Sequence, residues 1–460
     1  MAEKPGLNTS TNSTSARTTE DPVLTSTLNG IYSEGPRKAW STVIGACLVQ
    51  ICAIGILSSY GVFQDFYTRE WLSKSSTSAI SWIGSTQIFL EYFLAPIGGE
   101  LLDRGYFRSL VVVGCSLYLF SFFMLSFTAP QSFYQVFLAQ AVGMGLGVGI
   151  LFLPTSVVAI RHFKRNQALG IVDSTISLGG LIFSIVLNYL IHSHLGFAWG
   201  IRAVTLITLI CFLAGVFLMS MPGSENGKKE PNAPVRSSWR EVAISARKDW
   251  PYLLVIGQAF TMCLGTFVPS FYLQLFAVTH GTSKQASFYA LSILNFSGVF
   301  GRIIPNHLGD RYGVLKVYIP CLVTTGALCF AMLGAGRPTG LFPFAIFYGF
   351  FFGATNGMYL SIINSLSTGT SADQLWKRCG LSLIPPAVAA LIGSPITGSI
   401  LGSNYQWWRG ILFASVGIFV PFNRGQMLNY VIPFFAAHDS GCNMPGNWCP
   451  DNAHQEPKEH

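Results

Sequence analysis

Long apolar stretches separated by short polar segments follow one another along most of the chain. Twelve of them approach the roughly 20 residues that a helix needs to cross a bilayer. Six lie before a polar break and six after it, at residues 41–63, 80–101, 109–129, 132–155, 167–191 and 200–220, and at 251–277, 286–306, 316–336, 341–366, 380–402 and 409–436. The pattern predicts an all-α membrane protein made of two six-helix halves.

The polar segments divide the chain further. Residues 1–38 are rich in Ser, Thr and Asn, which is typical of a disordered tail. We expect a first six-helix bundle over 39–222, a basic linker over 223–249, a second bundle over 250–436 and a tail over 437–460. The last crossing is irregular, because the apolar run 410–422 is short and polar residues follow it. We therefore expect an atypical last helix, broken around Pro421–Gln426.

Composition and charge support a membrane protein and indicate its orientation. Charged residues make up 10% of the chain, against about 25% in soluble domains. The net charge of +8 fits Lys and Arg in cytoplasmic loops better than a nucleic-acid partner. If the N-terminus is cytoplasmic, the Lys and Arg residues favour the cytoplasmic side by about three to one. We expect a monomeric, multi-pass protein of the plasma membrane with both termini inside.

A polar motif occurs twice, each time after the second apolar run of a half. The first copy is "GGELLDRGYFRSL", Gly98–Leu110, and the second is "PNHLGDRYGVLKV", Pro305–Val317. Gly residues permit tight turns, and the charges can pair with neighbouring helix ends. Two matched copies favour a gating motif that holds the halves together, although the bases could instead only keep these loops inside. Its candidate residues are Gly99, Asp103, Arg104, Gly105, Arg108, Gly309, Asp310, Arg311, Gly313 and Lys316.

These two stretches resemble the loop signature of the major facilitator superfamily. Residues 58–67, 81–90, 300–313, 375–382 and 390–403 also resemble its fungal monocarboxylate-permease-like branch. The resemblance implies two six-helix halves related by pseudo-two-fold symmetry. It also implies that Asp103 lies near the eleventh helix and pairs with Arg161, and that Asp310 makes the equivalent contact near the fifth helix.

In that family the first, fourth, seventh and tenth helices line a central substrate cavity. Arg302 matches an arginine that binds carboxylates in proton-coupled carriers, or it could be a structural clamp. The acid and lysine that accompany this arginine are replaced by Gly298 and Ser58, which argues against proton-coupled import of a monocarboxylate. The candidate cavity residues are Tyr60, Gln140, Gln258, Gln274, Asn295, Arg302, Asn356 and Tyr359.

Two acids lie within the apolar runs and are candidates for proton coupling. Ionisable groups at membrane depth are functional candidates by default. Glu91 could carry a proton or bond a neighbouring helix, and Asp173 could act in coupling, although a capping or solvated role is favoured for it. Gly349, Gly353 and Gly357 at four-residue spacing predict a small helix face that allows close packing.

The predicted function is secondary active transport of a small organic solute by alternating access. The chain has no Walker-type loop for nucleotide and no clustered metal-ligand or catalytic residues, so we expect neither an ATP-driven pump nor an enzyme, and no cofactor or metal. An aromatic content of 14% favours an aromatic solute, for example an exported secondary metabolite. The alternatives are a proton-coupled importer of a monocarboxylate or vitamin-like acid, and a membrane sensor on a transporter fold.

Overall fold

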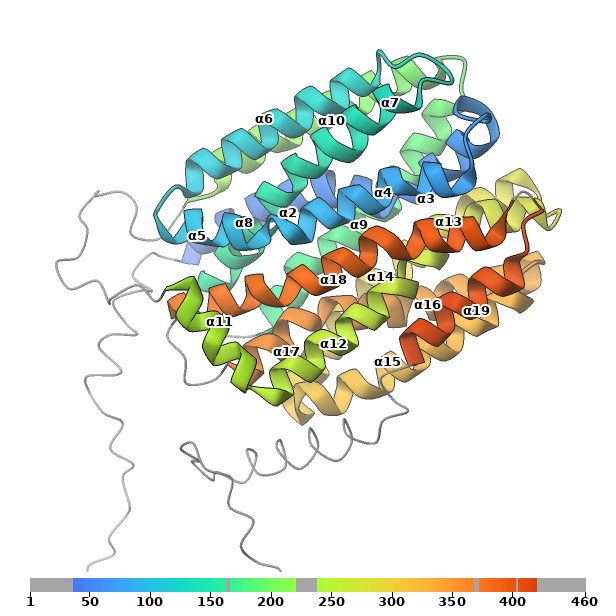
Figure 1. Cartoon of the computed structure of the whole chain (residues 1–460). Helices are drawn as coiled ribbons and strands as arrows, with labels where there is room; N and C mark the ends of the chain where they lie inside the picture. The colour runs from blue at the N-terminus through green and yellow to red at the C-terminus, as the bar shows by residue number, and fades with distance from the viewer. Residues whose placement is uncertain (1–35, 163–165, 221–237, 368–371, 403, 420–460) are drawn as a thin grey trace, which may run out of the picture.

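The computed structural model describes residues 36–162, 166–220, 238–367, 372–402 and 404–419, and every regular element within these ranges is helical (Figure 1). Helices are expected for apolar segments of this length, because a helix pairs its backbone N–H and C=O groups within one segment. In the described residues, ten helical segments are long and apolar enough to cross a membrane. The predicted all-α membrane fold is therefore confirmed.

The described part of the first half contains six helical segments, and three of them are built from more than one helical piece. In chain order they are α2 (Pro36–Ser58) with α3 (Tyr60–Phe66) and the π-helical turn η1 (Tyr67–Trp71); α4 (Thr77–Phe93) with α5 (Ala95–Asp103); α6 (Phe107–Leu125); α7 (Phe133–Val136) with the π-helical η2 (Phe137–Met144) and α8 (Gly145–His162); α9 (Asn166–Ile191); and α10 (Gly196–Leu218). Five of the six are among the ten that are long and apolar enough to cross a membrane; the exception is α4 with α5. Each predicted apolar run of this half corresponds to one of these segments.

The described part of the second half has the same plan, with one short helix in front of it. That helix is α11 (Trp239–Lys248). The segments are α12 (Trp250–Gly265) with α13 (Phe267–Thr279); α14 (Lys284–Tyr312); α15 (Val314–Ala331) with the 3-10 turn η3 (Met332–Gly334); α16 (Pro338–Gly357) with α17 (Tyr359–Leu366); α18 (Ala372–Leu401); and α19 (Trp407–Phe419). All but α19 are among the ten that are long and apolar enough to cross a membrane.

The structure differs from the predicted segment boundaries in two places. Helix α2 begins at Pro36, so the last residues of the predicted tail are helical. The predicted linker contains α11, because Ser238 and Glu241 form a capping box at its start. The rest of the predicted N-terminal tail, the predicted break at Pro421–Gln426 and the C-terminal tail lie outside the described residues.

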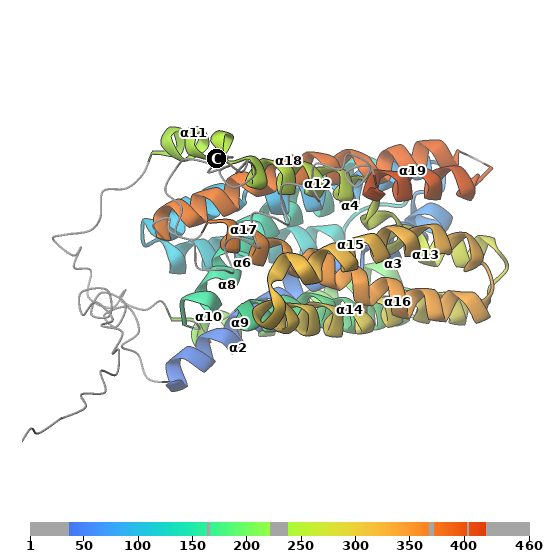
Figure 2. The same ribbon diagram turned by 90° about the horizontal axis from the view of Figure 1, so that it is seen from below.

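The two halves meet along two long helix pairs. Helix α4 packs against α18, and α9 packs against α14. At one end of the bundle α3 also packs against α13, and at the opposite end α5 packs against α18. Figures 1 and 2 show α13 and α11 at opposite ends. Any space between the halves can therefore be closed from either end.

Close packing within the second half depends on glycine. A Cβ at Gly349 of α16 would collide with the Leu294 carbonyl of α14, and one at Gly301 of α14 would collide with the Phe350 carbonyl of α16. Gly353 faces Gly298 in the same interface. The predicted small face on α16 is therefore confirmed for Gly349 and Gly353, and it brings the helix carrying Arg302 close to α16.

Candidate functional site

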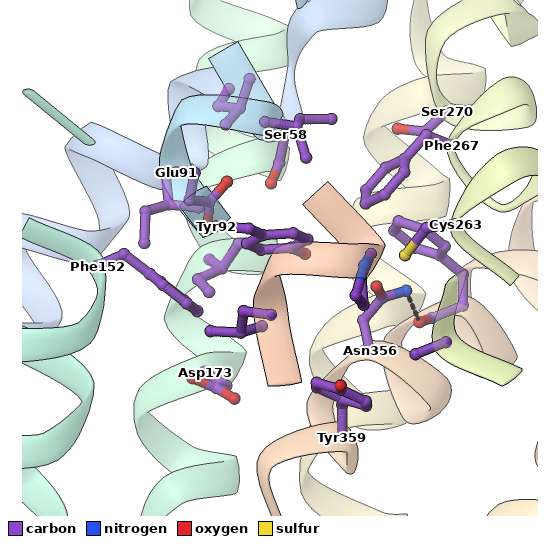
Figure 3. Close-up of a pocket in the computed structure, with 18 of the residues that line it drawn as sticks. Ser58, Glu91, Tyr92, Phe152, Asp173, Cys263, Phe267, Ser270, Asn356 and Tyr359 are labelled. Carbon is purple, nitrogen blue, oxygen red and sulfur yellow. Dashed lines mark hydrogen bonds between the residues drawn. The ribbon is translucent and has the colours of Figure 1, made fainter. Parts of the chain in front are cut away.

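A cavity of about 90 Å³ lies between the two halves (Figure 3). Four helices of the first half and six of the second contribute to its wall, namely α2, α4, α8, α9, α12, α13, α14, α16, α17 and α18. Sites for drug-sized ligands usually measure about 300–1,000 Å³. A solute of that size would require the halves to move apart, as expected for a cavity that opens during transport.

Aromatic rings form much of this wall. Tyr92 and Phe152 pack together in the first half with ring centroids 5.9 Å apart, and Phe267 and Phe352 do so in the second, also at 5.9 Å. Such rings offer flat apolar surfaces that suit aromatic ligands. The aromatic content of the sequence favoured an aromatic solute, but none of these four rings was among the candidate cavity residues.

Two carboxyl groups and one guanidinium group, from three helices, line the cavity. They are Glu91 on α4, Asp173 on α9 and Arg302 on α14. All three are buried, with exposed fractions of 4%, 5% and 8% respectively. Burial of charge is costly unless the group is paired or changes its protonation. The cavity can therefore interact strongly with a charged solute or with protons.

Arg302 also connects the two halves. Its Nε donates to Ser177 Oγ of α9 at 3.0 Å, one helical turn beyond Asp173. Asp173 Oδ1 has no hydrogen-bond partner among the described residues. The guanidinium has further N–H donors for an anionic group. Arg302 lines the cavity, and this position is compatible with the role of binding a carboxylate. Its bond to Ser177 is compatible with the alternative role of a structural clamp.

Two of the candidate cavity residues, Asn356 and Tyr359, line the cavity where the tenth segment changes from α16 to α17. The Asn356 amide donates to the Phe352 carbonyl at 2.8 Å, and the Tyr359 hydroxyl donates to the Ser382 carbonyl of α18 at 2.8 Å. Figure 3 shows the Asn356 side chain above that of Tyr359. The Asn356 carbonyl oxygen remains available to a ligand donor.

The other five predicted cavity residues do not line this cavity; they bond to neighbouring segments. The bonds are Tyr60 to the Ile80 carbonyl (2.7 Å), Tyr67 to Gln140 (2.7 Å), Tyr318 to Gln258 (2.8 Å), Gln274 to Asp65 (3.0 Å) and Asn295 to the Ser58 carbonyl (3.5 Å). Buried polar groups need such partners. In this structure these residues stabilise the helix packing around the cavity.

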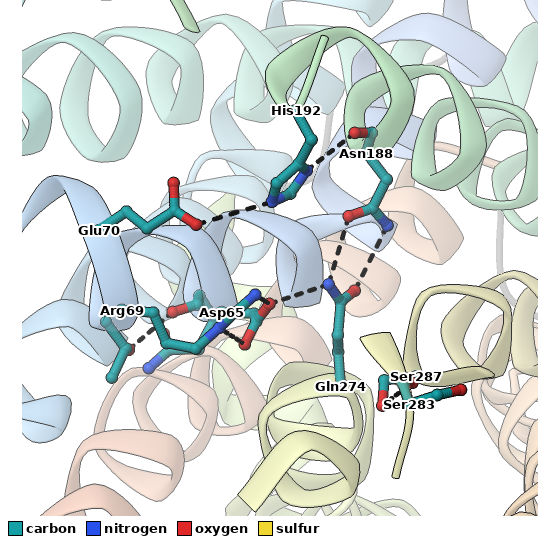
Figure 4. Close-up of polar contacts among 10 residues, drawn as sticks. Asp65, Arg69, Glu70, Asn188, His192, Gln274, Ser283 and Ser287 are labelled. Carbon is teal, nitrogen blue, oxygen red and sulfur yellow. Dashed lines mark hydrogen bonds and ion pairs between the residues drawn. The ribbon is translucent and has the colours of Figure 1, made fainter. Parts of the chain in front are cut away.

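A polar network that the sequence analysis missed joins the halves at the α3–α13 end (Figure 4). Asp65 of α3 is fully buried and accepts two bonds from Arg69, one of them from Nε at 2.7 Å. Gln274 Nε2 of α13 donates to the same carboxylate at 3.0 Å and to Asn188 Oδ1 of α9 at 3.2 Å. We call Asp65, Arg69, Asn188 and Gln274 the Asp65 bridge. Asp65 and Arg69 are an acid and a base four residues apart beside an apolar run, and this spacing is the feature of the sequence that could have indicated the bridge.

The opposite end carries a second contact between the halves. Glu100 Oε2 of α5 lies 3.6 Å from Lys377 Nζ of α18, and Glu100 Oε1 accepts from Arg104 Nε at 3.0 Å. The Lys377 side chain is only 4% exposed. We call Glu100, Arg104 and Lys377 the Glu100 bridge. Glu100 and Arg104 both belong to the first copy of the repeated motif, although Glu100 was not among its candidate gating residues. The side chains of the predicted pair, Asp103 and Arg161, lie outside what the structure describes, so their pairing stays a prediction.

The remaining motif residues lie at helix ends and turns. Gly105 and Gly313 have φ angles of +89° and +94°, so both make the left-handed turns expected of them. Gly99 lies in α5, Gly309 and Asp310 lie in the last turns of α14, and Lys316 lies in the first turn of α15. Arg108 and Arg311 are exposed, which suits bases near a membrane surface.

Comparison with known proteins identifies the family. Residues 39–307 match the Major Facilitator Superfamily. The aspyridones efflux protein apdF of Emericella nidulans is 32% identical over 372 residues, which are 80% of this chain and 73% of that protein. The MFS-type transporter dbaD of the same organism is 33% identical over 381 residues, 82% of each chain. The agnestins efflux protein AgnL12 of Paecilomyces divaricatus is 32% identical over 367 residues, 79% of this chain and 81% of that one.

A solved structure shares the same fold at much lower identity. The crystal structure of the nucleoside transporter NupG matches with a TM-score of 0.62 and 13% identity, over 85% of this chain and 99% of that one. The family match spans the first half and the start of the second, and the structural match extends over both halves. The chain therefore belongs to the Major Facilitator Superfamily of membrane transporters.

Proposed function

We propose that this chain is a secondary active transporter that exports an aromatic organic solute, of the kind made as a secondary metabolite, by alternating access. One observation carries the proposal: a cavity between two packed halves combines aromatic walls with buried Glu91, Asp173 and Arg302. Relatives named as efflux proteins for aspyridones and agnestins support the export direction.

Inter-half contacts at both ends of the bundle support alternating access. The Asp65 bridge joins the halves at one end and the Glu100 bridge joins them at the other. A rocking motion that breaks one contact while keeping the other would open the cavity to one side at a time. In this proposal the twice-repeated motif is the cytoplasmic gate, and the Asp65 bridge closes the outer end.

Ion coupling and the branch of the family also belong to the proposal. Glu91 and Asp173 are the candidates for proton coupling, because both acids are buried beside the solute cavity.

The position one turn before Arg302 is Gly298, which packs against α16, so the acid expected in monocarboxylate carriers is absent there. Arg302 nevertheless suits a solute with a carboxylate or an acidic hydroxyl. Import of such an acid by a monocarboxylate-permease-like protein is the second candidate.

The proposed placement is a monomer in the plasma membrane with both termini cytoplasmic. The excess of Lys and Arg on one set of loops supports this orientation. The first bundle then spans residues 39–222 and the second spans 250–436, with the basic linker 223–249 on the cytoplasmic side.

Untargeted mass spectrometry of cells and medium, with the gene deleted and then restored, tests the function. A compound that accumulates inside the deletion strain and leaves on restoration supports export and identifies the solute. A compound left in the medium by the deletion strain supports import instead. The control is a deletion strain restored with the Arg302→Ala gene at an equal protein level. It distinguishes an effect of transport through the cavity from an effect of the mere presence of the protein. No difference in any compound would favour the membrane sensor.

A further inference from the structure

The start of the linker helix α11 is stabilised by a capping box in its own sequence, and its position is stabilised by packing on the second half. The Ser238 hydroxyl caps its first turn, and the Glu241 carboxylate accepts from the Ser238 backbone N–H at 3.1 Å. Val242 and Ala246 are buried in the contact of α11 with α18 and α12. The helix is therefore docked on the second half rather than loosely tethered to it.

Consecutive cations of α18 connect to both ends of α11. Lys377 Nζ lies 5.7 Å from the centre of the Trp239 ring at the start of α11, and the same ammonium group reaches Glu100 of the first half at 3.6 Å. Arg378 pairs with Asp249, the residue after α11, and lies over the Tyr252 ring at 4.7 Å. Through Lys377, α11 is thus in direct contact with the Glu100 bridge.

The outward face of α11 combines positive charge with an exposed apolar side chain. Ile244 is 47% exposed. Arg240, Arg247 and Lys248, at i−4, i+3 and i+4 from it, are also exposed and surround it on the helix surface. The single acid of the helix, Glu241, is engaged at the cap. A cluster of bases next to a membrane-crossing segment suits contact with anionic lipid headgroups.

The position of α11 places that face at the depth of the lipid headgroups. Helix α11 ends at Lys248, and a membrane-crossing segment begins at Trp250, which is 71% exposed. Tryptophan favours the membrane–water interface. Figure 1 shows α11 across the end of the bundle, beside the first turns of α12 and α18.

We propose that α11 binds anionic phospholipid headgroups through Arg240, Arg247 and Lys248, and that this binding stabilises the Glu100–Lys377 contact between the halves. The proposal rests on the alternating-access function proposed above. A ligand shifts a conformational equilibrium when it binds one state more tightly than the other. Headgroups that hold α11 in place also hold Trp239 against Lys377, and Lys377 is then positioned to meet Glu100.

Spin-label distances in nanodiscs test this proposal without any transported solute. Labels at Tyr106→Cys and Tyr312→Cys, two exposed positions at the same end of the two halves, report on opening at that end. The ten native cysteines are replaced beforehand. When phosphatidylserine is added to phosphatidylcholine nanodiscs, we expect the distance distribution to shift towards its short component. No shift would overturn the proposal.

Matched variants assign the effect to α11. Arg240→Ala/Arg247→Ala should abolish the shift, whereas Arg37→Ala/Lys38→Ala, which removes two exposed bases from the start of α2, should keep it. A shift retained in the α11 variant would overturn the proposal. Should that variant misfold, high salt provides the same test on the unaltered chain, because screening should remove the shift.

Two further measurements test the source of the anion and the role of Trp239. Inorganic phosphate added to phosphatidylcholine nanodiscs should have no effect, and a shift caused by it would overturn the assignment to the membrane surface. Trp239→Ala should still retain phosphatidylserine in native mass spectrometry but lose the shift. A full shift in Trp239→Ala would overturn the coupling through Lys377. Because no solute is involved, either failure is distinguishable from failure of the proposed export.

Discussion

Gln274 of α13 donates a hydrogen bond to Asp65 of α3 over 3.0 Å and so joins the two halves at one end of the bundle. Arg69, from the same half as Asp65, supplies the other bonds to this carboxylate. The same Gln274 side chain also exchanges hydrogen bonds with Asn188, at 3.2 and 3.4 Å. The Asp65 bridge thus combines an ion pair within the first half with an amide from the second.

Gln274→Leu should favour the state that is open at the α3–α13 end. The substitution removes all three hydrogen bonds to the first half and places an apolar side chain against a buried carboxylate, which costs about 1–3 kcal/mol. We expect a Cys introduced at Ser58, in the cavity wall, to react several-fold faster with a membrane-impermeant maleimide added from that side. Gln258→Leu is the matched control, because Gln258 bonds Tyr318 within the second half. An equal increase in both variants would exclude a gating role for Gln274.

Arg302→Ala should strongly reduce export while leaving the protein folded. It removes the cavity's basic side chain and its bond to Ser177, and a charged hydrogen bond of this kind contributes about 1.5–3 kcal/mol. We expect the export rate per molecule to fall by about 10- to 100-fold, with Arg302→Lys intermediate because lysine lacks the planar set of donors. Initial rates of export of the identified solute measure this effect.

Arg202→Ala is the control for the loss of an arginine. Arg202 bonds Ser126 and lies over the rings of Phe127 and Trp199, away from the cavity wall. We expect its export rate to stay close to that of the unaltered chain. Unchanged affinity for an anionic solute in Arg302→Ala would remove Arg302 from the binding site.

Much of the fold could be predicted from the sequence because the signals were local. A run of apolar residues is sufficient to indicate a crossing, and an ionisable residue inside such a run stands out, as Glu91, Asp173 and Arg302 did. The capping box of Ser238 and Glu241 could also have been predicted from the sequence, although it is not among the predictions above. These features depend only on residues within one segment.

The direction in which neutral polar residues face could not be predicted in the same way. In a membrane bundle both the lipid-facing and the core-facing sides of a helix are apolar, so periodicity indicates the inner face only weakly. Gln140 and Gln258 lie on the expected helices, but they bond Tyr67 and Tyr318 rather than facing the cavity. The pairing of Glu100 with Lys377 likewise depends on the packing of α5 against α18, residues far apart in the chain.

Glu91→Gln should make export independent of pH if Glu91 carries the coupled proton. A glutamine keeps the size and polarity of the protonated acid but cannot release a proton. The measurement is the export rate at several external pH values, compared with the unaltered chain and with Asp173→Asn. Glu70→Gln, which alters a more exposed acid at the α3–α13 end, should keep the normal profile. A preserved profile in both Glu91→Gln and Asp173→Asn would show that neither acid carries the proton.

Gly349→Ala should lower the stability of the protein, whereas Gly257→Ala should leave it unchanged or raise it. A Cβ at Gly349 would collide with the Leu294 carbonyl, so α14 and α16 would have to separate; overpacking of this kind costs about 1–3 kcal/mol. At Gly257 of α12 a Cβ meets no atom within 4 Å, and replacement of a helical glycine by alanine stabilises a helix by about 0.5–1 kcal/mol. Thermal unfolding of the purified protein in detergent should show a lower midpoint for the first variant and an equal or higher one for the second. Equal midpoints would mean that α14 and α16 can separate at little cost, and the close approach of these helices would then not determine the position of Arg302.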